Sequence, residues 1–206
     1  MKVLPARNIA VALLTLMATG CVSVIPEPTA PDAVYQLAYR GGALGGQELS
    51  GVIVVREPDG PRLLAGRQIT AEAEDGGLAV LGTAQWADNA TLMLQFALID
   101  RLNAFGGNGV AVDNAAGSRG DVEIHWRLQE FGLSDSEARA SFVLSILDGR
   151  TRAPLAQERL SASVPGSEVA SLITASDQAL ADAAEFVRGF MVGYMSELDR
   201  LTDDRS

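Results

Sequence analysis

The chain has 206 residues, of which 48% are hydrophobic and 5% aromatic, and this size and composition fit one well-buried globular domain. Its 26 acidic residues outnumber its 16 Lys and Arg residues, which gives a formal net charge of −10. Nucleic acid is therefore disfavoured as a partner, because binding it depends on clustered Lys and Arg that neutralise phosphates. The only lysine is Lys2, so a folded domain downstream has none for Schiff-base chemistry or for a phosphate-binding loop.

The first twenty residues have the pattern of a secretory signal peptide. Lys2 and Arg7 give a positively charged start, residues 9–17 are apolar except for Thr15, and small residues follow at 18–20. The apolar run is only half as long as the roughly 20 residues that a membrane-spanning helix needs. We therefore expect residues 1–20 to be a cleaved signal peptide and the protein to be exported.

The only cysteine, Cys21, directly follows this segment. A disulfide would need a cysteine from another chain, and a catalytic thiol would need a nearby base on a rigid scaffold. The sequence "LMATGC" instead matches a lipobox, in which Cys21 becomes the first mature residue and carries acyl chains. One acyl chain anchors a protein only marginally, whereas two or three anchor it stably. We predict lipid attachment at Cys21; a plain secreted protein with an incidental cysteine is the alternative.

The residues after Cys21 predict the compartment and a spacer. Val22 stands where lipoproteins kept at the inner membrane often have Asp, which favours anchoring in the outer membrane with the domain facing the periplasm. Residues 21–32 contain three prolines and no periodic pattern, which predicts a lipidated, semi-extended tether. At about 3.1 Å per residue, the eleven residues after Cys21 reach up to roughly 34 Å. A single folded domain is expected over residues 33–202.

The first half of this domain contains short strand-like stretches and one apolar helix. The strand-like stretches are residues 33–39, 50–56, 67–73 and 77–86. The helix is predicted over residues 92–102, with Asp88 or Asn89 as its cap and a glycine pair just beyond its end. Its wide apolar surface predicts burial on most sides.

Residues 121–129 alternate between apolar and polar side chains, which predicts a strand with one solvated face. The alternation slips at Glu130 and Phe131, which predicts a bulge or the end of the strand. Residues 137–149 and 153–163 continue as a predicted hairpin. The solvated face of the first strand carries Glu123, His125, Arg127 and Gln129.

The last predicted element is a long amphipathic helix that starts near Ser167 and Glu168. Its apolar residues recur mostly every three, four or seven positions, but towards its end they exceed one buried seam. Burial against the sheet would explain most of them. The alternative, an exposed patch for a partner or for self-association, predicts contacts at Phe186, Phe190, Met191, Tyr194 and Met195.

Together these elements predict an α+β fold: a single domain with a mainly antiparallel sheet and two helices packed on one face. Several stretches resemble the ABC-type transport auxiliary lipoproteins, the paraquat-inducible protein C-like family. They include "AQWADNATLMLQFALIDRL" (84–102), "DVEIHWRLQEF" (121–131) and "ASFVLSILDGRTRAPLAQERLSA" (140–162). The resemblance implies an accessory role in a bacterial ABC system that moves lipids or other apolar compounds through the envelope. The partners it implies are a permease, an ATPase and a substrate-binding protein with a mammalian cell entry (MCE) domain.

No pattern in the mature chain indicates a catalytic residue, a metal site or a cofactor. His125 is the only histidine, so a triad or a metal cluster would have to be built around it. We interpret it as part of a solvated strand face. The two tryptophans, Trp86 and Trp126, are interpreted as core or edge packing, and three carboxylates as ordinary turn polarity: Glu72, Glu74 and Asp75.

We therefore predict a non-enzymatic, outer-membrane-anchored periplasmic lipoprotein that serves as an auxiliary component of an MCE-type ABC system. Its contacts are expected through the last helix or through an exposed strand edge, with a partner or with further copies of the chain. One alternative is an envelope assembly factor that braces an outer-membrane partner. A lipid-binding module is another and would need an apolar groove. An envelope enzyme is disfavoured, because a second cysteine and a second histidine are missing from the sequence.

Overall fold

The computed structural model of the chain describes residues 30–203, with the exception of residues 47, 74 and 116. The predicted signal peptide, Cys21 and the tether up to residue 29 lie outside the described residues. None of the described helices combines the length and the hydropathy that crossing a membrane requires.

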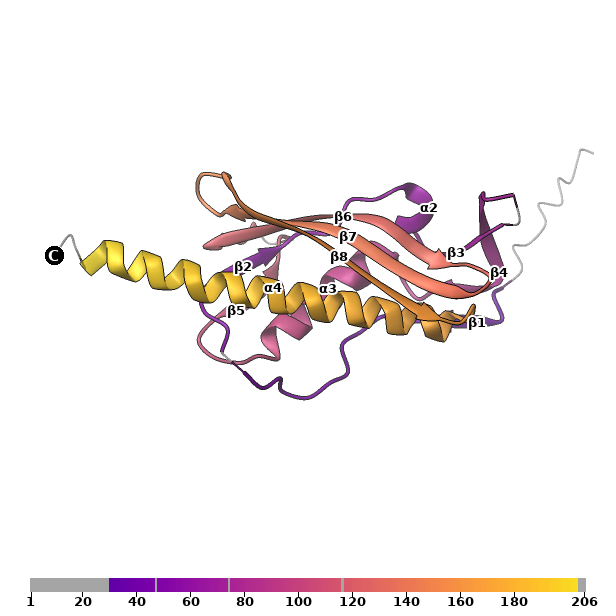
Figure 1. Cartoon of the computed structure of the whole chain (residues 1–206), viewed down its shortest axis with the longest axis horizontal. Helices are drawn as coiled ribbons and strands as arrows, with labels where there is room; N and C mark the ends of the chain where they lie inside the picture. The colour runs from indigo at the N-terminus through magenta and orange to yellow at the C-terminus, as the bar shows by residue number, and fades with distance from the viewer. Residues whose placement is uncertain (1–29, 47, 74, 116, 204–206) are drawn as a thin grey trace, which may run out of the picture. The chain divides into compact units, whose positions relative to one another are not determined.

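Figure 1 shows the arrangement of eight strands and three helices in the described part of the chain. The strands are β1 Ala33–Tyr35, β2 Val52–Val55, β3 Gln68–Glu72, β4 Leu78–Trp86, β5 Val110–Asp113, β6 Val122–Leu133, β7 Glu137–Asp148 and β8 Pro154–Pro165. The helices are α2 Arg62–Ala65, α3 Ala90–Asn103 and α4 Val169–Asp203.

The three longest strands, β6, β7 and β8, form an antiparallel meander that runs from the middle of the sheet to one edge. Trp126 of β6 lies opposite Leu144 of β7, which lies opposite Glu158 of β8. The register of β6 shifts between Leu128 and Glu130 while the strand continues to Leu133, so of the two predicted outcomes it is the bulge that is present. The predicted hairpin between β7 and β8 is also present.

The other edge of β6 is shared by two shorter strands, and here the pairing is parallel. β2 pairs with the first part of β6 and β3 with its end, while β2 pairs in parallel with β5 as well. β3 and β4 form an antiparallel hairpin, and β1 adds in parallel to the end of β4. The predicted α+β fold with a mainly antiparallel sheet is therefore confirmed, and the shorter parallel pairs make the sheet mixed rather than purely antiparallel. The short β5 and the four-residue α2 are further elements that the sequence patterns do not predict.

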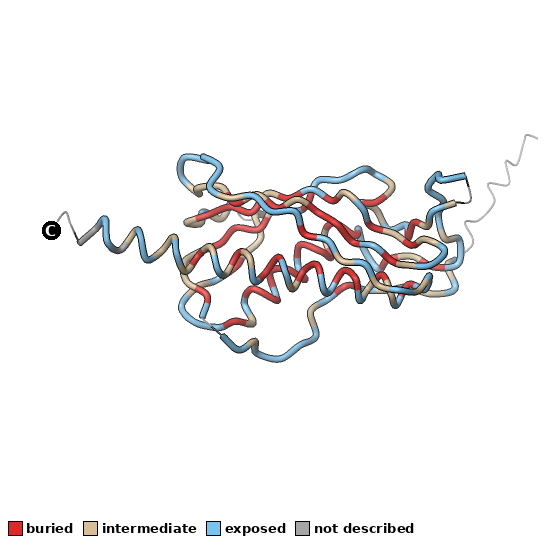
Figure 2. Tube along the Cα trace, in the orientation of Figure 1, coloured by how far each residue is buried: buried red, intermediate tan, exposed pale blue. Residues whose placement is uncertain are grey.

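Helices α3 and α4 contact each other and pack on the sheet, α3 over β2 and β5 and α4 over β6, β7 and β8. Figure 2 shows the buried residues gathered where these helices face the strands. The inner side of α4 is lined largely by small side chains, which let the helix approach the sheet closely. Its fully buried residues are Leu172, Ala175, Ser176, Ala179, Ala183, Ala184, Val187 and Met191.

Helix α3 is buried on most sides, as its wide apolar surface predicts. Leu94, Leu98 and Leu102 have no exposed surface, because the sheet covers one side of the helix and α4 another. Asn89 holds the cap position, although its side chain makes no capping hydrogen bond with the described residues. Arg101 of α3 is nearly buried and forms an ion pair with Asp177 of α4. This pair joins the two helices beside their apolar contact.

Candidate contact surface on the carboxy-terminal helix

The predicted contact residues lie in the second half of α4, beside Gly51, which precedes β2, and Asp148 at the end of β7. Four of them, Phe186, Phe190, Tyr194 and Met195, are partly buried and pack against the core. Met191 is fully buried, so the core of the protein already covers this predicted contact residue. We use the name "α4 contact surface" for the four partly buried residues, whose role in binding stays a prediction.

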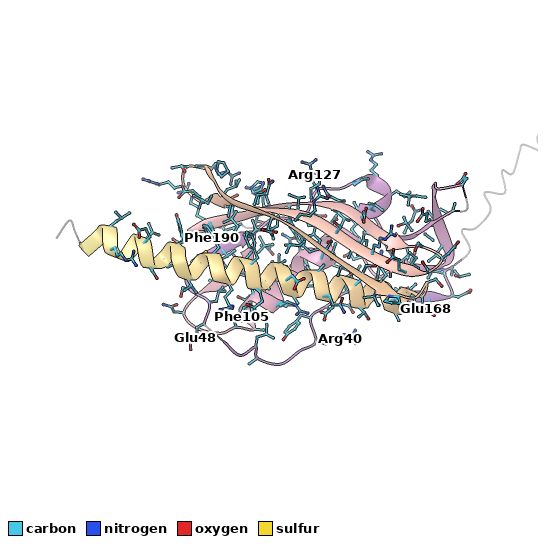
Figure 3. The ribbon with its side chains drawn as sticks, viewed as in Figure 1. Arg40, Glu48, Phe105, Arg127, Glu168 and Phe190 are labelled. Carbon is cyan, nitrogen blue, oxygen red and sulfur yellow. The ribbon has the colours of Figure 1, made fainter. Side chains whose placement is uncertain are left out.

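Aromatic stacking organises this surface. The rings of Phe190 and Tyr194 stack with their centroids 5.5 Å apart and their planes at 21°, as expected for side chains four residues apart on a helix. On α4 nearby, the guanidinium of Arg188 lies 5.1 Å from the ring centroid of Phe105, which follows α3. Figure 3 labels Phe190 and Phe105 near α4. The second half of the helix is therefore held by specific contacts as well as by its apolar seam.

Gly51 lets the methionines of α4 approach the start of β2. A Cβ atom at this glycine would lie 2.9 Å from Cε of Met191 and 3.1 Å from Sδ of Met195. The backbone of Gly51 also has φ = +75°, a conformation that other residues adopt only with strain. Sequence reasoning misses this residue, because nothing near residue 51 signals that a helix 140 positions further on will cross it.

A hydrogen bond ties α4 to the turn between β7 and β8. The hydroxyl of Tyr194 donates to Oδ2 of Asp148 at 3.0 Å, and the backbone N–H of Thr151 donates to Oδ1 at 2.6 Å. The hydrogen bonds from the backbone and hydroxyl of Thr151, together with that from Tyr194, lower the pKa of Asp148 to about 2. The pKa of Tyr194 is raised, mainly by burial and to a lesser extent by this hydrogen bond.

We expect the Asp148→Asn variant to melt at a lower temperature than the wild type at neutral pH and to lose stability less steeply in acid. The pKa of Asp148 is about 2 in the folded protein, below its ordinary value of 3.8. Its contribution is therefore present above pH 4 and is lost as the pH falls from about 4 towards 2. Thermal denaturation followed by circular dichroism between pH 7 and 2 measures this difference.

The matched control is Tyr194→Phe, which keeps the bonds from Thr151 and removes only the link to the helix. It should show part of the same change in acid dependence. If the melting temperature of Asp148→Asn falls in acid as steeply as that of the wild type, the ionised carboxylate of Asp148 does not stabilise the folded protein.

The end of α4 continues beyond the strands, as Figure 1 shows. Its last turns change from buried to intermediate and exposed residues in Figure 2. Leu198 is half-buried there, and Leu201 has 49% of its surface exposed. This end therefore extends the α4 contact surface with apolar side chains that the sheet does not fully cover.

Glu123 is buried, which corrects the prediction that it lies on a solvated strand face. Arg56 and Arg152 both form ion pairs with it, and His125 Nε2 lies 3.3 Å from its Oε2. Burial acts to raise the pKa of Glu123, but the hydrogen bonds from Arg56 and His125 and the nearby charges outweigh it and lower the pKa. The arginines come from other parts of the chain, so the alternation within β6 cannot predict them.

The structure also places the tryptophans and Arg127, which the sequence analysis names. Trp86 is fully buried and stacks on Phe131 at 5.5 Å, and Trp126 is buried beside Phe142, which confirms their packing role. Arg127 is exposed and is labelled in Figure 3 on the side of the sheet away from α4. Among the described residues, no group of three His, Cys, Asp or Glu side chains is placed to hold a metal ion.

A cavity of about 750 Å³ lies between the first half of α4 and the segment that follows β1. Its volume falls within the range of about 300–1,000 Å³ that is common for small-molecule pockets. Its lining includes Arg101, which is paired with Asp177 and lies 4.6 Å from the ring centroid of Tyr39. Its lining also includes Arg40, Gln36 and Thr174, so it is not the apolar groove that the lipid-binding alternative requires.

Comparison with known proteins adds a family to this geometry. The model of the family described as "ABC-type transport auxiliary lipoprotein component" matches residues 35–187, which spans the fold from β1 into the α4 contact surface. Comparison with curated protein sequences finds no significant match.

Two solved structures share the fold. Protein XCC0632 from Xanthomonas campestris superposes with a TM-score of 0.65 at 17% identity, covering 81% of this chain and 99% of that one. A crystal structure of an uncharacterised protein superposes with a TM-score of 0.60 at 14% identity, covering 77% of this chain and 97% of that one. Because the family model covers most of the folded part, this chain belongs to the ABC-type transport auxiliary lipoprotein family.

Proposed function

We propose that this protein is a non-enzymatic auxiliary subunit of an MCE-type ABC system that moves lipids or other apolar compounds through the bacterial envelope. The observation that carries the proposal is the family match over residues 35–187, preceded in the sequence by a lipobox at Cys21. The proposed organisation is a signal peptide (1–20), a lipidated tether (21–32) and the auxiliary domain (33–202). The proposed anchor is the outer membrane, with the domain in the periplasm.

The α4 contact surface is the proposed meeting point with the transport machinery. Partly exposed aromatic and methionine side chains are enriched at protein interfaces, where they supply much of the binding energy. Phe190, Tyr194 and Met195 combine these side chains with the apolar end of the helix. The formal charge of the whole chain is −10, and cleavage of the signal peptide removes Lys2 and Arg7 as well, so the mature protein is more acidic still. This charge favours a partner with a basic docking surface, because opposite charges steer association. The partner that best fits this role is the MCE-domain protein, which works with the permease and the ATPase.

Photo-crosslinking from Phe190 in the native envelope tests this proposal. A photoreactive phenylalanine analogue at this position should capture the MCE-domain protein, a second copy of the chain, or both. The matched control carries the same analogue at Phe96, which is 44% exposed on α3, away from the α4 contact surface. Crosslinks from Phe190 should exceed those from Phe96 at least about tenfold.

Other outcomes would replace the proposal. Crosslinks from Phe190 only to outer-membrane barrel proteins would favour the assembly factor that braces an outer-membrane partner. Equal yields from Phe190 and Phe96 would mean that the α4 contact surface is not the docking site.

A further inference from the structure

Strand β4 leaves most of its outer edge unpaired by the described strands. It has nine residues, but β1 covers only Ala84–Trp86, which leaves the stretch from Leu78 to Thr83 open on that side. We call this stretch the β4 outer edge. Its sequence, "LAVLGT", contains no charged residue and no proline, and Leu78 and Val80 have 56% and 42% of their surface exposed.

Two other free edges among the described strands, those of β5 and β8, carry features that discourage the addition of another strand. On β5, the side chain of Asn103 bonds both the N–H and the C=O of Ala111, at 2.8 and 3.0 Å. On β8, Pro154 and Pro165 stand at the two ends and Glu158 and Arg159 in the middle. The β4 outer edge carries neither a capping side chain of this kind nor a charge.

The backbone groups that face outward on β4 follow from the hairpin with β3. Ala73 donates to the carbonyl of Gly77 at 2.8 Å, and Ala71 lies opposite Ala79 two residues further on. In an antiparallel pair, hydrogen-bonded positions alternate with positions whose groups point to the other side. The N–H and C=O groups of Leu78 and Val80 therefore point away from β3, towards the β4 outer edge.

We infer that the β4 outer edge binds an extended segment of a different polypeptide as an added strand. Main-chain hydrogen bonds to Leu78 and Val80 would give such a strand its affinity, and contacts with the exposed side chains of these residues its selectivity. Leu78 also lines a cavity of about 240 Å³, whose lining mixes apolar side chains such as Leu64 and Leu133 with charged ones such as Glu72. Apolar residues at alternate positions of the added strand would cover this face.

The charges around the β4 outer edge select the partner. Glu72 and Asp75 lie near one end and Asp32 and Asp88 near the other, and all four are exposed. Two cations lie close to them: Arg67, which donates to the carbonyl of Trp86 at 3.3 Å, and Arg139, which lines the same cavity as Glu72 but is paired with Glu137. A segment with Lys or Arg at its ends therefore fits. A second copy paired through the same edge would bring carboxylates of the two chains together, which is unfavourable.

The chain's own tether is a poor candidate for the same place. Continuing β1 upstream in register would set Pro31 opposite Gly82. Tyr35 accepts a hydrogen bond from Ala87 of the segment after β4, so alternate residues of this segment, including position 31, face β4. Pro31 has no N–H to donate there, so it interrupts the ladder at the point where the β4 outer edge begins.

The test places a photo-crosslinking residue at position 82 of the full-length protein in the native envelope. Gly82 has room for a side chain, because a Cβ atom there would meet no described atom within 4 Å. We expect capture of a different polypeptide, at a segment with alternating apolar residues and flanking Lys or Arg. Val80→Pro removes one outward N–H and should lower the yield at least about fivefold, the effect of one lost hydrogen bond. The matched variant Val80→Thr keeps this N–H and should stay within about twofold.

A double variant, Glu72→Gln with Asp75→Asn, keeps the backbone and tests the charge argument if Val80→Pro does not fold. It should lower the yield and weaken its dependence on salt. The inference would be overturned if the crosslinker captured nothing, only residues 22–29 of the same chain, or only a second copy. It would also be overturned if neither variant changed the yield.

This inference deepens the proposed function, because it rests on a partner polypeptide in the envelope, but the two fail separately. Capture from Gly82 of a basic, extended segment outside any transport system would uphold the β4 outer edge and remove the transport assignment. Capture of the MCE-domain protein from Phe190, with no capture from Gly82, would uphold the transport assignment and remove the role of the β4 outer edge.

Discussion

Replacing Cys21 with serine should release the protein from the envelope membrane into the soluble periplasmic fraction. A serine hydroxyl does not form the thioether that carries the diacylglyceryl group, so the mature chain would lose its acyl chains. Each buried methylene of such a chain contributes about 0.8 kcal/mol to membrane binding, and two or three chains together give stable anchoring. The expected change is therefore from almost wholly membrane-bound to almost wholly soluble, measured by fractionation and immunoblotting.

Mass spectrometry of the amino-terminal peptide completes this test. The wild-type protein should begin at Cys21 and carry acyl mass, and the control Ser23→Ala, which leaves Cys21 intact, should do the same. A wild-type protein that is unmodified and soluble after osmotic shock would support the plain secreted alternative and remove the anchor from the proposed function.

Replacing Phe142 with alanine should destabilise the fold by about 3–5 kcal/mol, the usual cost of removing a large buried aromatic side chain. Phe142 has no exposed surface, and its ring meets that of Trp126 edge-on with centroids 5.2 Å apart. It lies in the middle of β7, one of the strands against which α4 packs. The cavity left behind would loosen the layer between the sheet and the helices. Urea denaturation followed by tryptophan fluorescence measures the change.

Val143→Ala is the matched control on the neighbouring position of β7. Its side chain points to the other face of the sheet and is only half-buried, so the expected cost is about 1 kcal/mol. Equal effects of the two variants would contradict the assignment of the Phe142 face as the core.

The two faces of β6 show which features local sequence predicts and which depend on distant residues. The alternation over residues 121–129 predicts correctly that Ile124, Trp126 and Leu128 share one buried face. It fails for Glu123, because burial of this carboxylate depends on Arg56 and Arg152, which reach it from other segments. A charge is buried when its partners are in place, and no local pattern reports partners.

The α4 contact surface also combines features that the sequence predicts with features that depend on the tertiary structure. Helical spacing predicts the long helix and its apolar excess, and four of the five residues derived from it are partly buried at the helix surface. Met191 is fully buried, whereas Met195, which approaches Gly51 as well, stays partly exposed. Sequence spacing gives the angle of a side chain around its own helix, but which angles are covered depends on how the helix lies on the sheet.

The sequence by itself determined the elements whose side-chain period repeats over many residues: the β6–β8 meander, its bulge, α3 and α4. It also carries the lipobox prediction at Cys21, which is a purely local pattern. Only the tertiary structure decided the parallel partners of β2, the short strand β5 and the open edge of β4. Parallel strands are joined by long connections rather than by tight turns, so their pairing leaves no signal between neighbouring residues. An edge is open or closed according to which strand arrives beside it, and that choice is made by the packing of the whole domain.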